Sequence, residues 1–207
     1  MENMRTLFSL LIGYFIGCLN PAKIVSQRKG VDLRHEGTGN LGTTNTVLVM
    51  GKSWGILVLL IDIGKAILSA KIAKWLFPKL VAAGMLAAFG AILGHIFPFH
   101  MGFHGGKGLA SFGGLVLEYN PLVFLVLLSI GLVLAVIVNF GVALPVSAAI
   151  LFPIAVAIVS RSLPLFLTAL GASAVVLYVH RDNVTKAIRG NDIRVRDWLR
   201  SQFSPSN

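Results

Sequence analysis

Long runs of apolar residues alternate with short polar segments along nearly the whole chain. A membrane-spanning helix needs about 20 predominantly apolar residues. The fourth apolar run, Leu109–Leu117, is too short to cross the membrane unless it includes the glycines before it. A half-helix or a locally thinned bilayer is the alternative. The pattern therefore predicts an all-α integral membrane protein with about seven transmembrane helices, one of them short. The candidate runs are Met4–Leu19, Trp54–Leu76, Leu80–Phe97, Leu109–Leu117, Leu122–Val138, Val142–Val159 and Leu163–Val179.

The composition supports this interpretation. The chain has 207 residues, of which 56% are hydrophobic and 13% charged, which excludes an ordinary soluble domain and favours a single membrane domain over residues 1–207. A net charge of +10 is compatible with nucleic-acid binding, but the basic residues fall between apolar runs, so we expect a lipid bilayer and no nucleic acid as partner. The single cysteine, Cys18, excludes an intrachain disulfide and a thiolate metal cluster.

The distribution of lysine and arginine orients the spans. Cytoplasmic loops carry an excess of these residues. With the N-terminus outside, four cations lie outside, Arg5, Lys74, Lys79 and Arg161, and two lie within the second span. Residues 180–207 then form a basic cytoplasmic tail. The twelve cytoplasmic cations are Lys23, Arg28, Lys29, Arg34, Lys52, Lys107, Arg181, Lys186, Arg189, Arg194, Arg196 and Arg200.

Three polar or glycine-rich segments, 37–45, 105–108 and 180–183, fall on this same predicted face. In the first, glycines permit positive φ and close approach of the backbone, and successive amides form a concavity that suits phosphate. A tight solvated turn with Asx and Ser/Thr caps is the alternative. We favour a site for a phosphate or phosphate ester, with Arg34 just upstream. Its other members are Gly37, Thr38, Gly39, Asn40, Gly42, Thr43 and Asn45.

The second segment places Lys107 among Gly105, Gly106 and Gly108, before an apolar run. A lysine ammonium beside the N-terminal amides of a helix attracts an anion through both its own charge and the amide dipoles. The spacing is not that of a Walker loop, so ATP is not implied, and we expect no cofactor.

Three histidines precede this loop and could be proposed as metal ligands: His95, His100 and His104. Pro98 and Gly102 break the helical spacing that would align them, and no acidic residue accompanies them. Interfacial histidines without a metal are the favoured interpretation.

The third segment places His180 and Asn183 at i and i+3, so a helix that continues this far puts both on one face. They are candidates to orient or deprotonate a hydroxyl and to polarise a carbonyl, or alternatively to cap the last span at the interface. Asp62 and Lys65 lie inside the second span, where a charged pair is costly unless it faces the bundle interior. We expect this pair to line or support the same cavity.

With these residues in view, the chain resembles the bacterial membrane acyltransferases that transfer an acyl group from acyl phosphate to glycerol 3-phosphate, the PlsY type. The resemblance rests on three motifs in order, at Gly30–Asn45, Gly94–Gly108 and His180–Asn183 with Gly190. It implies seven spans in the bacterial inner membrane, with a cytoplasmic active site. It also implies catalytic roles for Lys107, His180 and Asn183. The substrate phosphates would be bound by Arg34, Gly37, Thr38, Gly39, Asn40, Gly42, Thr43, Asn45, His95, Gly105, Gly106 and Gly108.

The sequence departs from the family pattern at several positions. Thr38 replaces a usual serine and keeps the hydroxyl. Leu48 replaces a frequent arginine, and Phe140 and Ala143 stand where the fifth loop often has arginine and serine. Fewer guanidiniums would weaken neutralisation of two phosphate-bearing substrates.

The expected activity is therefore transfer of a fatty acyl group from acyl phosphate to the 1-hydroxyl of glycerol 3-phosphate, which gives lysophosphatidic acid. A phosphate-ester or anion transporter, or a catalytically silent membrane paralogue, are the alternatives. The identity of the general base, the acyl-chain preference and the oligomeric state stay open.

Overall fold

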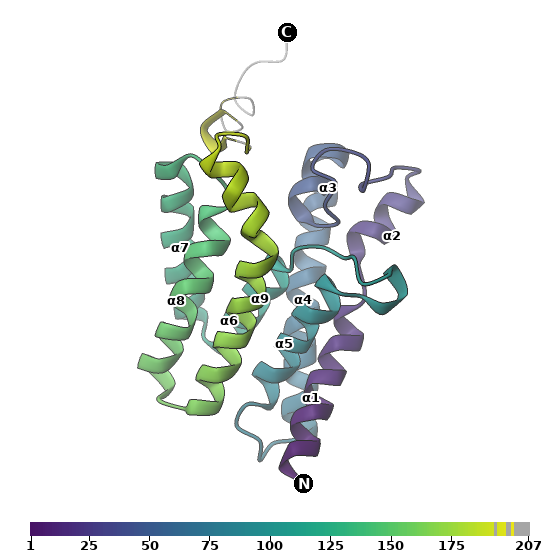
Figure 1. The fold of residues 1–207 in the computed structure, drawn as a ribbon. Helices are drawn as coiled ribbons and strands as arrows, with labels where there is room; N and C mark the ends of the chain where they lie inside the picture. Colours follow the sequence, from purple (N-terminus) through teal and green to yellow (C-terminus); the bar gives the residue numbers. More distant parts are fainter. Residues whose placement is uncertain (193, 198–199, 201–207) are drawn as a thin grey trace.

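A computed structural model describes residues 1–192, 194–197 and 200 of the chain (Figure 1). Within these residues the secondary structure is helical, apart from loops and one isolated antiparallel bridge between Phe140 and Arg194. The all-α prediction is confirmed. The elements are α1 (Glu2–Gly17), α2 (Pro21–Arg28), α3 (Thr43–Met50), α4 (Lys52–Leu76), α5 (Ala83–Ile96), the 3₁₀ turn η1 (Phe99–Met101), α6 (Leu109–Tyr119), α7 (Pro121–Val138), α8 (Ala143–Ser160) and α9 (Leu163–Ile188).

The predicted spans correspond closely to helices, but their number stays a prediction. Five segments of the described chain are long and apolar enough to cross a membrane: Glu2–Arg28, Ala83–Met101, Pro121–Val138, Ala143–Ser160 and Leu163–Ile188. With 25 residues α4 has the length, but it contains five charged residues. With 11 residues α6 extends only about 16 Å, against a hydrocarbon core of about 30 Å.

The helices form two groups with α6 between them, α1, α4 and α5 on one side and α7, α8 and α9 on the other (Figure 1). Close contact between α1 and α5 depends on glycine. A Cβ atom at Gly13 would lie 1.7 Å from the carbonyl oxygen of Ala87, so the two backbones touch where a side chain would stand. Small residues four apart allow such approach between helices in a membrane. The contact uses Gly13 and Gly17 of α1, and Gly90 and Gly94 of α5.

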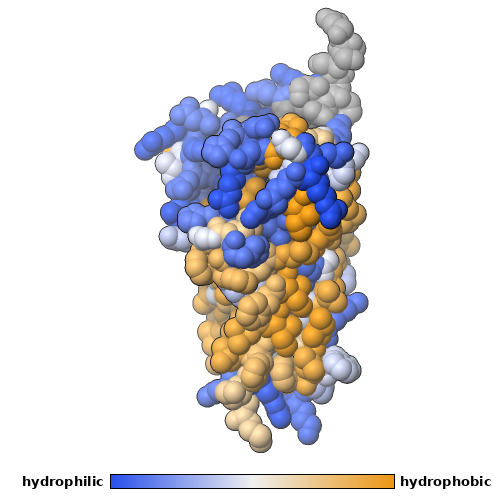
Figure 2. Space-filling view, turned by 90° about the vertical axis from the view of Figure 1, so that its right-hand side faces the viewer, coloured by the Kyte–Doolittle hydropathy of each residue, from blue (hydrophilic) through white to orange (hydrophobic). Residues whose placement is uncertain are grey.

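The core of the second group is built from aromatic and small side chains. The rings of Phe112 on α6 and Phe152 on α8 meet edge to face with centroids 5.5 Å apart, and Ala169 and Ala172 of α9 are fully buried nearby. Large aliphatic side chains instead cover the outside of α1, α7, α8 and α9. Figure 2 shows this apolar belt with hydrophilic residues above and below it, which is the surface of an integral membrane protein.

One end of the bundle carries the polar loops, and the N-terminus lies at the opposite end (Figure 1). At this polar end α1 gives way to α2, where the Asn20 side chain accepts a hydrogen bond from Lys23 N at 2.8 Å and Pro21 occupies the first helical position. These are preferred residues at a helix start. The helix is therefore interrupted at Cys18–Asn20, and α2 begins as a separate helix.

The C-terminal part differs from the expected tail because α9 continues to Ile188. Beyond it, Arg196 donates from its guanidinium to the carbonyl oxygens of Val136 and Ile137, both at 3.1 Å, near the end of α7. Basic side chains can donate to the unpaired last carbonyls of a helix and interact favourably with its dipole. The parts of the predicted tail at residues 193, 198–199 and 201–207 lie outside the described residues.

Candidate active site

Asn45 organises the glycine-rich loop from inside it. The side chain is fully buried, its Oδ1 accepts from Thr38 N at 2.6 Å, and its Nδ2 donates to the carbonyls of Leu33 and Glu36 at 2.9 and 3.1 Å. Gly37 has φ +61°, and a Cβ atom there would lie 2.3 Å from Asn45 Oδ1. The predicted phosphate ligand Asn45 is thus engaged with the loop backbone, and it shapes the loop.

The first turn of α3 is the part of this loop with free polar groups. Gly42 is the N-cap and provides no capping side chain, while a Cβ atom there would lie 3.1 Å from Asn40 Nδ2. The hydroxyl of Thr43 is buried without a hydrogen-bond partner among the described residues. Gly39 has φ +71°, and its amide is already bonded to Glu36 O. A helix start with unfilled amides and a buried hydroxyl suits an anion.

The second glycine-rich segment packs against the end of α5. Gly105 N donates to Ile96 O at 2.9 Å, and Gly106 N donates to His95 O at 3.1 Å. A Cβ atom at Gly106 would lie 2.2 Å from His95 Nε2. Gly108, with φ +74°, is the N-cap of α6. Gly105 and Gly106 therefore serve close packing, and their amides are not available to a phosphate as the sequence had led us to expect.

Lys107 links this loop to the last helix, because its ammonium contacts Asn183 Oδ1 on α9. The side chain is half-buried. Burial lowers its pKa, and the nearby Lys186 lowers the pKa further, against the opposite effect of Asp192 and Asp182. The structure thus brings the second and third polar segments together around a cation.

His180 lies one turn before Asn183 on the same face of α9, as the spacing predicted. It is 6% exposed, and its Nδ1 lies 2.8 Å from the carbonyl oxygen of Val176. A carbonyl only accepts, so Nδ1 donates and Nε2 is left with a lone pair. This tautomer presents a hydrogen-bond acceptor or base on the remaining ring nitrogen.

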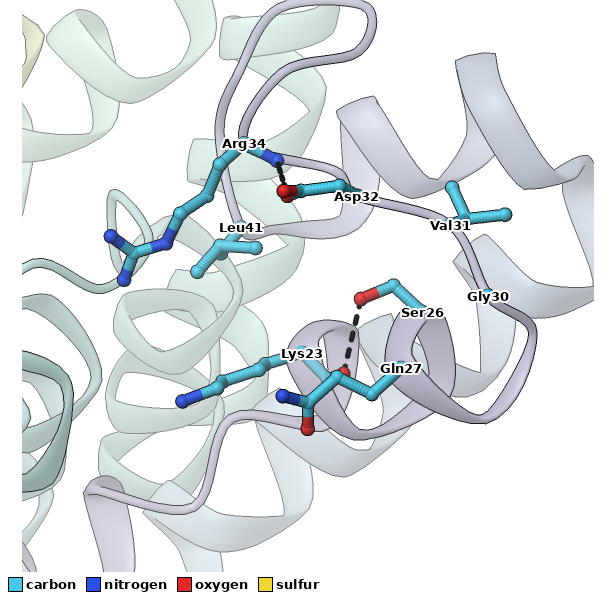
Figure 3. A pocket seen from close by; sticks show the side chains of 8 residues that line it. All are labelled: Lys23, Ser26, Gln27, Gly30, Val31, Asp32, Arg34 and Leu41. Atoms are coloured by element: carbon cyan, nitrogen blue, oxygen red, sulfur yellow. Dashed lines mark hydrogen bonds between the residues drawn. The ribbon is translucent and has the colours of Figure 1, made fainter.

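Arg34 joins the first polar loop to the second, since its guanidinium donates to His104 O at 2.8 Å. It also borders a cavity of about 380 Å³ between α2 and the following loop, where its side chain and that of Lys23 extend in the same direction (Figure 3). Sequence reasoning did not select Lys23 as a site residue, although it follows the recognisable cap formed by Asn20 and Pro21. The cavity is lined by Lys23, Ser26, Gln27, Gly30, Val31, Asp32, Arg34 and Leu41.

His95 occupies a different place from the one expected. It is 3% exposed, and its Nδ1 lies 2.8 Å from Lys65 Nζ and 3.1 Å from Asp62 Oδ1. The ring therefore belongs to a buried charged cluster, and a direct contact with a substrate phosphate does not fit this geometry. The other two histidines of this segment, His100 and His104, are exposed, and no group of three metal-ligating side chains is found in the described part of the chain.

The three departures that replace a polar residue by an apolar one lie near these elements. Leu48 is 40% exposed on α3. Phe140 and Ala143 line an apolar cavity of about 250 Å³ between the start of α8 and the last turns of α9, together with Val184, the neighbour of Asn183. Phe140 and Ala143 therefore make this part of the α7–α8 connection apolar.

The fold and the site define a multi-pass membrane protein whose polar loops meet at one end of the helical bundle around a lysine, a histidine and an asparagine. Residues 7–190 match the model of the family described as glycerol-3-phosphate acyltransferase. The chain belongs to this family.

Similar proteins extend over nearly the whole chain. A protein of Aquifex aeolicus strain VF5, named glycerol-3-phosphate acyltransferase, is 31% identical over 195 residues, which cover 92% of this chain and 100% of that protein. A protein of Thermoanaerobacter strain X514 with the same name is 29% identical over 193 residues, covering 93% and 96%. The crystal structure of PlsY, an integral membrane glycerol 3-phosphate acyltransferase, in its glycerol 3-phosphate form superposes with a TM-score of 0.87 at 28% identity, covering 96% of this chain and 99% of the other. Its lysophosphatidic acid form gives 0.83, covering 91% and 94%.

Proposed function

We propose that this protein transfers a fatty acyl group from acyl phosphate to the 1-hydroxyl of glycerol 3-phosphate and releases lysophosphatidic acid and inorganic phosphate. The observation that carries the proposal is the contact of Lys107 with Asn183, one turn from His180, in a member of this family. The similar PlsY structures are described in glycerol 3-phosphate and lysophosphatidic acid forms, an acceptor and a product of this reaction.

The chemistry follows from the donor. Acyl phosphate is a mixed anhydride, so the acceptor hydroxyl attacks the acyl carbon, the bond from that carbon to the phosphate oxygen breaks, and phosphate leaves. No covalent enzyme intermediate is needed, and the main contribution of the protein is to hold both substrates together. The hydroxyl proton goes to His180 Nε2 or to the phosphate of the donor. Asn183 accepts from Lys107 through Oδ1, so its Nδ2 is left to polarise the acyl carbonyl.

We assign the substrate phosphates to the space bordered by Lys107, Arg34 and the first turn of α3. Support comes from the two cations, the uncapped helix start and the unpartnered hydroxyl of Thr43. Thr38 and Asn40 lie in the loop that leads into α3, and they complete the proposed set of phosphate-binding residues. Asn45, His95, Gly105 and Gly106 contribute by shaping the loops.

We also propose that the polar end of the bundle faces the cytoplasm of a bacterial cell, in the inner membrane. Lysines and arginines concentrate at this end, which is the side that the positive-inside rule makes cytoplasmic. A water-soluble acceptor such as glycerol 3-phosphate would then enter from the cytoplasm, and the acyl chain would lie along the apolar belt.

The direct test is to incubate the purified protein in lipid nanodiscs with palmitoyl phosphate and radiolabelled glycerol 3-phosphate. We expect labelled lysophosphatidic acid and an equal amount of released phosphate, and product formation about tenfold or more slower in the Lys107→Ala variant at the same substrate concentrations. Acyl-coenzyme A in place of acyl phosphate tests the identity of the donor. A folded parent protein that makes no more product than empty nanodiscs would contradict the proposal.

The apolar α7–α8 connection gives a specific reason to consider a second candidate, a catalytically silent paralogue. A silent paralogue would bind glycerol 3-phosphate or lysophosphatidic acid in calorimetry but give no turnover. In an active but donor-impaired enzyme, Leu48→Arg, alone or with Phe140→Arg, should strengthen use of acyl phosphate by about 1.5–3 kcal/mol for each charge-assisted hydrogen bond at most. A folded double variant whose use of acyl phosphate is the same as the parent's favours the silent paralogue. Uptake of a phosphate ester by proteoliposomes would then distinguish a silent paralogue from an anion transporter.

A further inference from the structure

A buried charged cluster lies next to the glycine-rich loop that carries Lys107. Asp62 and Lys65 of α4 and His95 of α5 are 1%, 4% and 3% exposed. Lys65 Nζ lies 2.8 Å from Asp62 Oδ1, 2.8 Å from His95 Nδ1 and 2.9 Å from the carbonyl oxygen of Leu19 at the break between α1 and α2. All three donors of the ammonium thus have acceptors, and the cluster joins three segments of the chain.

These contacts fix the orientation of the histidine. Its Nδ1 lies between the ammonium of Lys65 at 2.8 Å, which only donates, and Asp62 Oδ1 at 3.1 Å, which only accepts, so one edge of the ring is held by both charged groups. The other edge of the ring packs against Gly106, where a Cβ atom would lie 2.2 Å from Nε2. The backbone oxygen of the same histidine accepts from Gly106 N.

Gly106 immediately precedes Lys107 and is enclosed from the other side as well. A Cβ atom at Gly106 would lie 2.5 Å from the carbonyl oxygen of Leu41, and that carbonyl accepts from the Asn20 side chain at 3.4 Å. The residue before the proposed catalytic lysine is therefore held between the histidine of the cluster and the first polar loop.

A buried ion pair gives little net stability compared with well-packed apolar residues of the same volume. Specific positioning of a neighbouring element explains better why three polar groups occupy this place. We propose that Asp62, Lys65 and His95 are positioning residues that act through Gly106 to hold the Lys107 ammonium against Asn183 and the substrate phosphate. The inference rests on the proposed function, in which Lys107 contacts substrate.

A double-mutant cycle tests this coupling. His95→Leu removes the acceptor for Lys65, and we expect it to lower kcat/KM for glycerol 3-phosphate about tenfold or more. In the Lys107→Ala background the same change should cost less than about twofold, since residues that act through one another are not additive. His95→Asn, whose Oδ1 can replace Nδ1 as acceptor, should recover most of the activity. Thr168→Val, at a buried hydroxyl on α9 bonded to Pro164 O, is the control and should leave kcat/KM unchanged.

Gly106→Ala provides a second variant, which removes none of the buried charged groups but forces Gly106 and His95 apart. It should show the same loss of kcat/KM as His95→Leu, and this loss should likewise be smaller in the Lys107→Ala background. Equal losses in the parent and Lys107→Ala backgrounds, for both variants, would overturn the proposal, because they indicate a general effect on the fold.

A measurement independent of activity separates this inference from the proposed function. His95→Leu should accelerate amide hydrogen exchange at residues 104–110 at least severalfold and leave α7 unchanged. If the parent protein shows no acyl transfer, this arm still decides whether the cluster holds the loop. Unchanged exchange at residues 104–110 in His95→Leu and Gly106→Ala would overturn the positioning role.

Discussion

Replacing Lys107 by alanine is the sharpest test of the proposed site. Its ammonium is half-buried between the glycine-rich loop and α9, and it contacts Asn183. A hydrogen bond to a charged group contributes about 1.5–3 kcal/mol. Because a tenfold rate factor corresponds to about 1.36 kcal/mol, one such bond to the substrate phosphate predicts a loss of about 10- to 150-fold in kcat/KM for glycerol 3-phosphate.

The assay is steady-state release of phosphate in nanodiscs, with each substrate varied in turn. Lys107→Arg should recover activity only in part, because a planar guanidinium does not replace a point charge in a narrow site. Lys79→Ala is the matched control: it removes one exposed lysine in the connection between α4 and α5, at the other end of the bundle. We expect unchanged kinetics for this variant.

The pH dependence provides a second readout of the same lysine. Burial and Lys186 lower the pKa of Lys107 below its ordinary value of 10.5, so the charged form that binds phosphate is lost at a lower pH than for an exposed lysine. In the parent protein kcat/KM should therefore fall on the alkaline side before pH 10.5. The Lys107→Arg variant should lack this descending limb, since arginine stays charged.

The result that refutes this reasoning is a folded Lys107→Ala protein with kcat/KM within about twofold of the parent. The loop around it would then be a packing element only, and the substrate phosphate would have to be bound elsewhere. An equal loss in Lys79→Ala would point instead to a general effect of net charge.

Three further predictions concern the fold and the orientation. Asn45→Ala removes three hydrogen bonds in the first polar loop, and at about 1 kcal/mol each this should lower the free energy of unfolding by about 3 kcal/mol, measured by urea or thermal unfolding in detergent. Gly13→Val should separate α1 from α5 and lower the thermal midpoint strongly, whereas Gly64→Ala, which has open space around it, should not. Cysteines placed at Lys29 and at Lys79 should react with a membrane-impermeant reagent from opposite sides of the membrane, and reaction of both from outside would contradict the proposed topology.

Much of the helical architecture could be predicted from the apolar runs. The predicted span Leu122–Val138 corresponds to α7 within one residue, and Leu109–Leu117 to the short α6. The predicted first span ends at Leu19, within two residues of the end of α1 at Gly17. The following helix α2 was not predicted, although Asn20 followed by Pro21 is a recognisable helix start. The glycine pairs of α1 and α5 were also present in the sequence, but which helices pack together is not a local property.

The sequence indicated which polar segments form the candidate site, but it did not indicate the contacts between them. A glycine in a polar loop is compatible with both phosphate binding and close packing, and only the position of His95 against Gly106 distinguishes them. The spacing of Asp62 and Lys65 indicated a buried pair, but their partner comes from another helix, thirty residues beyond Lys65. Such long-range contacts leave no signal in a single sequence.

The substitutions in the α7–α8 connection have a consequence for how this protein handles two phosphates. Arg196 comes close to that connection, but its guanidinium is bonded to the end carbonyls of α7 and does not replace an arginine at Phe140. With Leu48 in place of an arginine, α3 carries no cation. In the proposed site, neutralisation would therefore depend on Lys107, on Arg34, which already donates to His104 O, and on the amides of the first turn of α3. Amides are fixed dipoles in the fold, whereas charged side chains that reach solvent are screened by salt. The contribution of α3 to phosphate binding should therefore persist at ionic strengths that weaken the contribution of the lysine and arginine side chains.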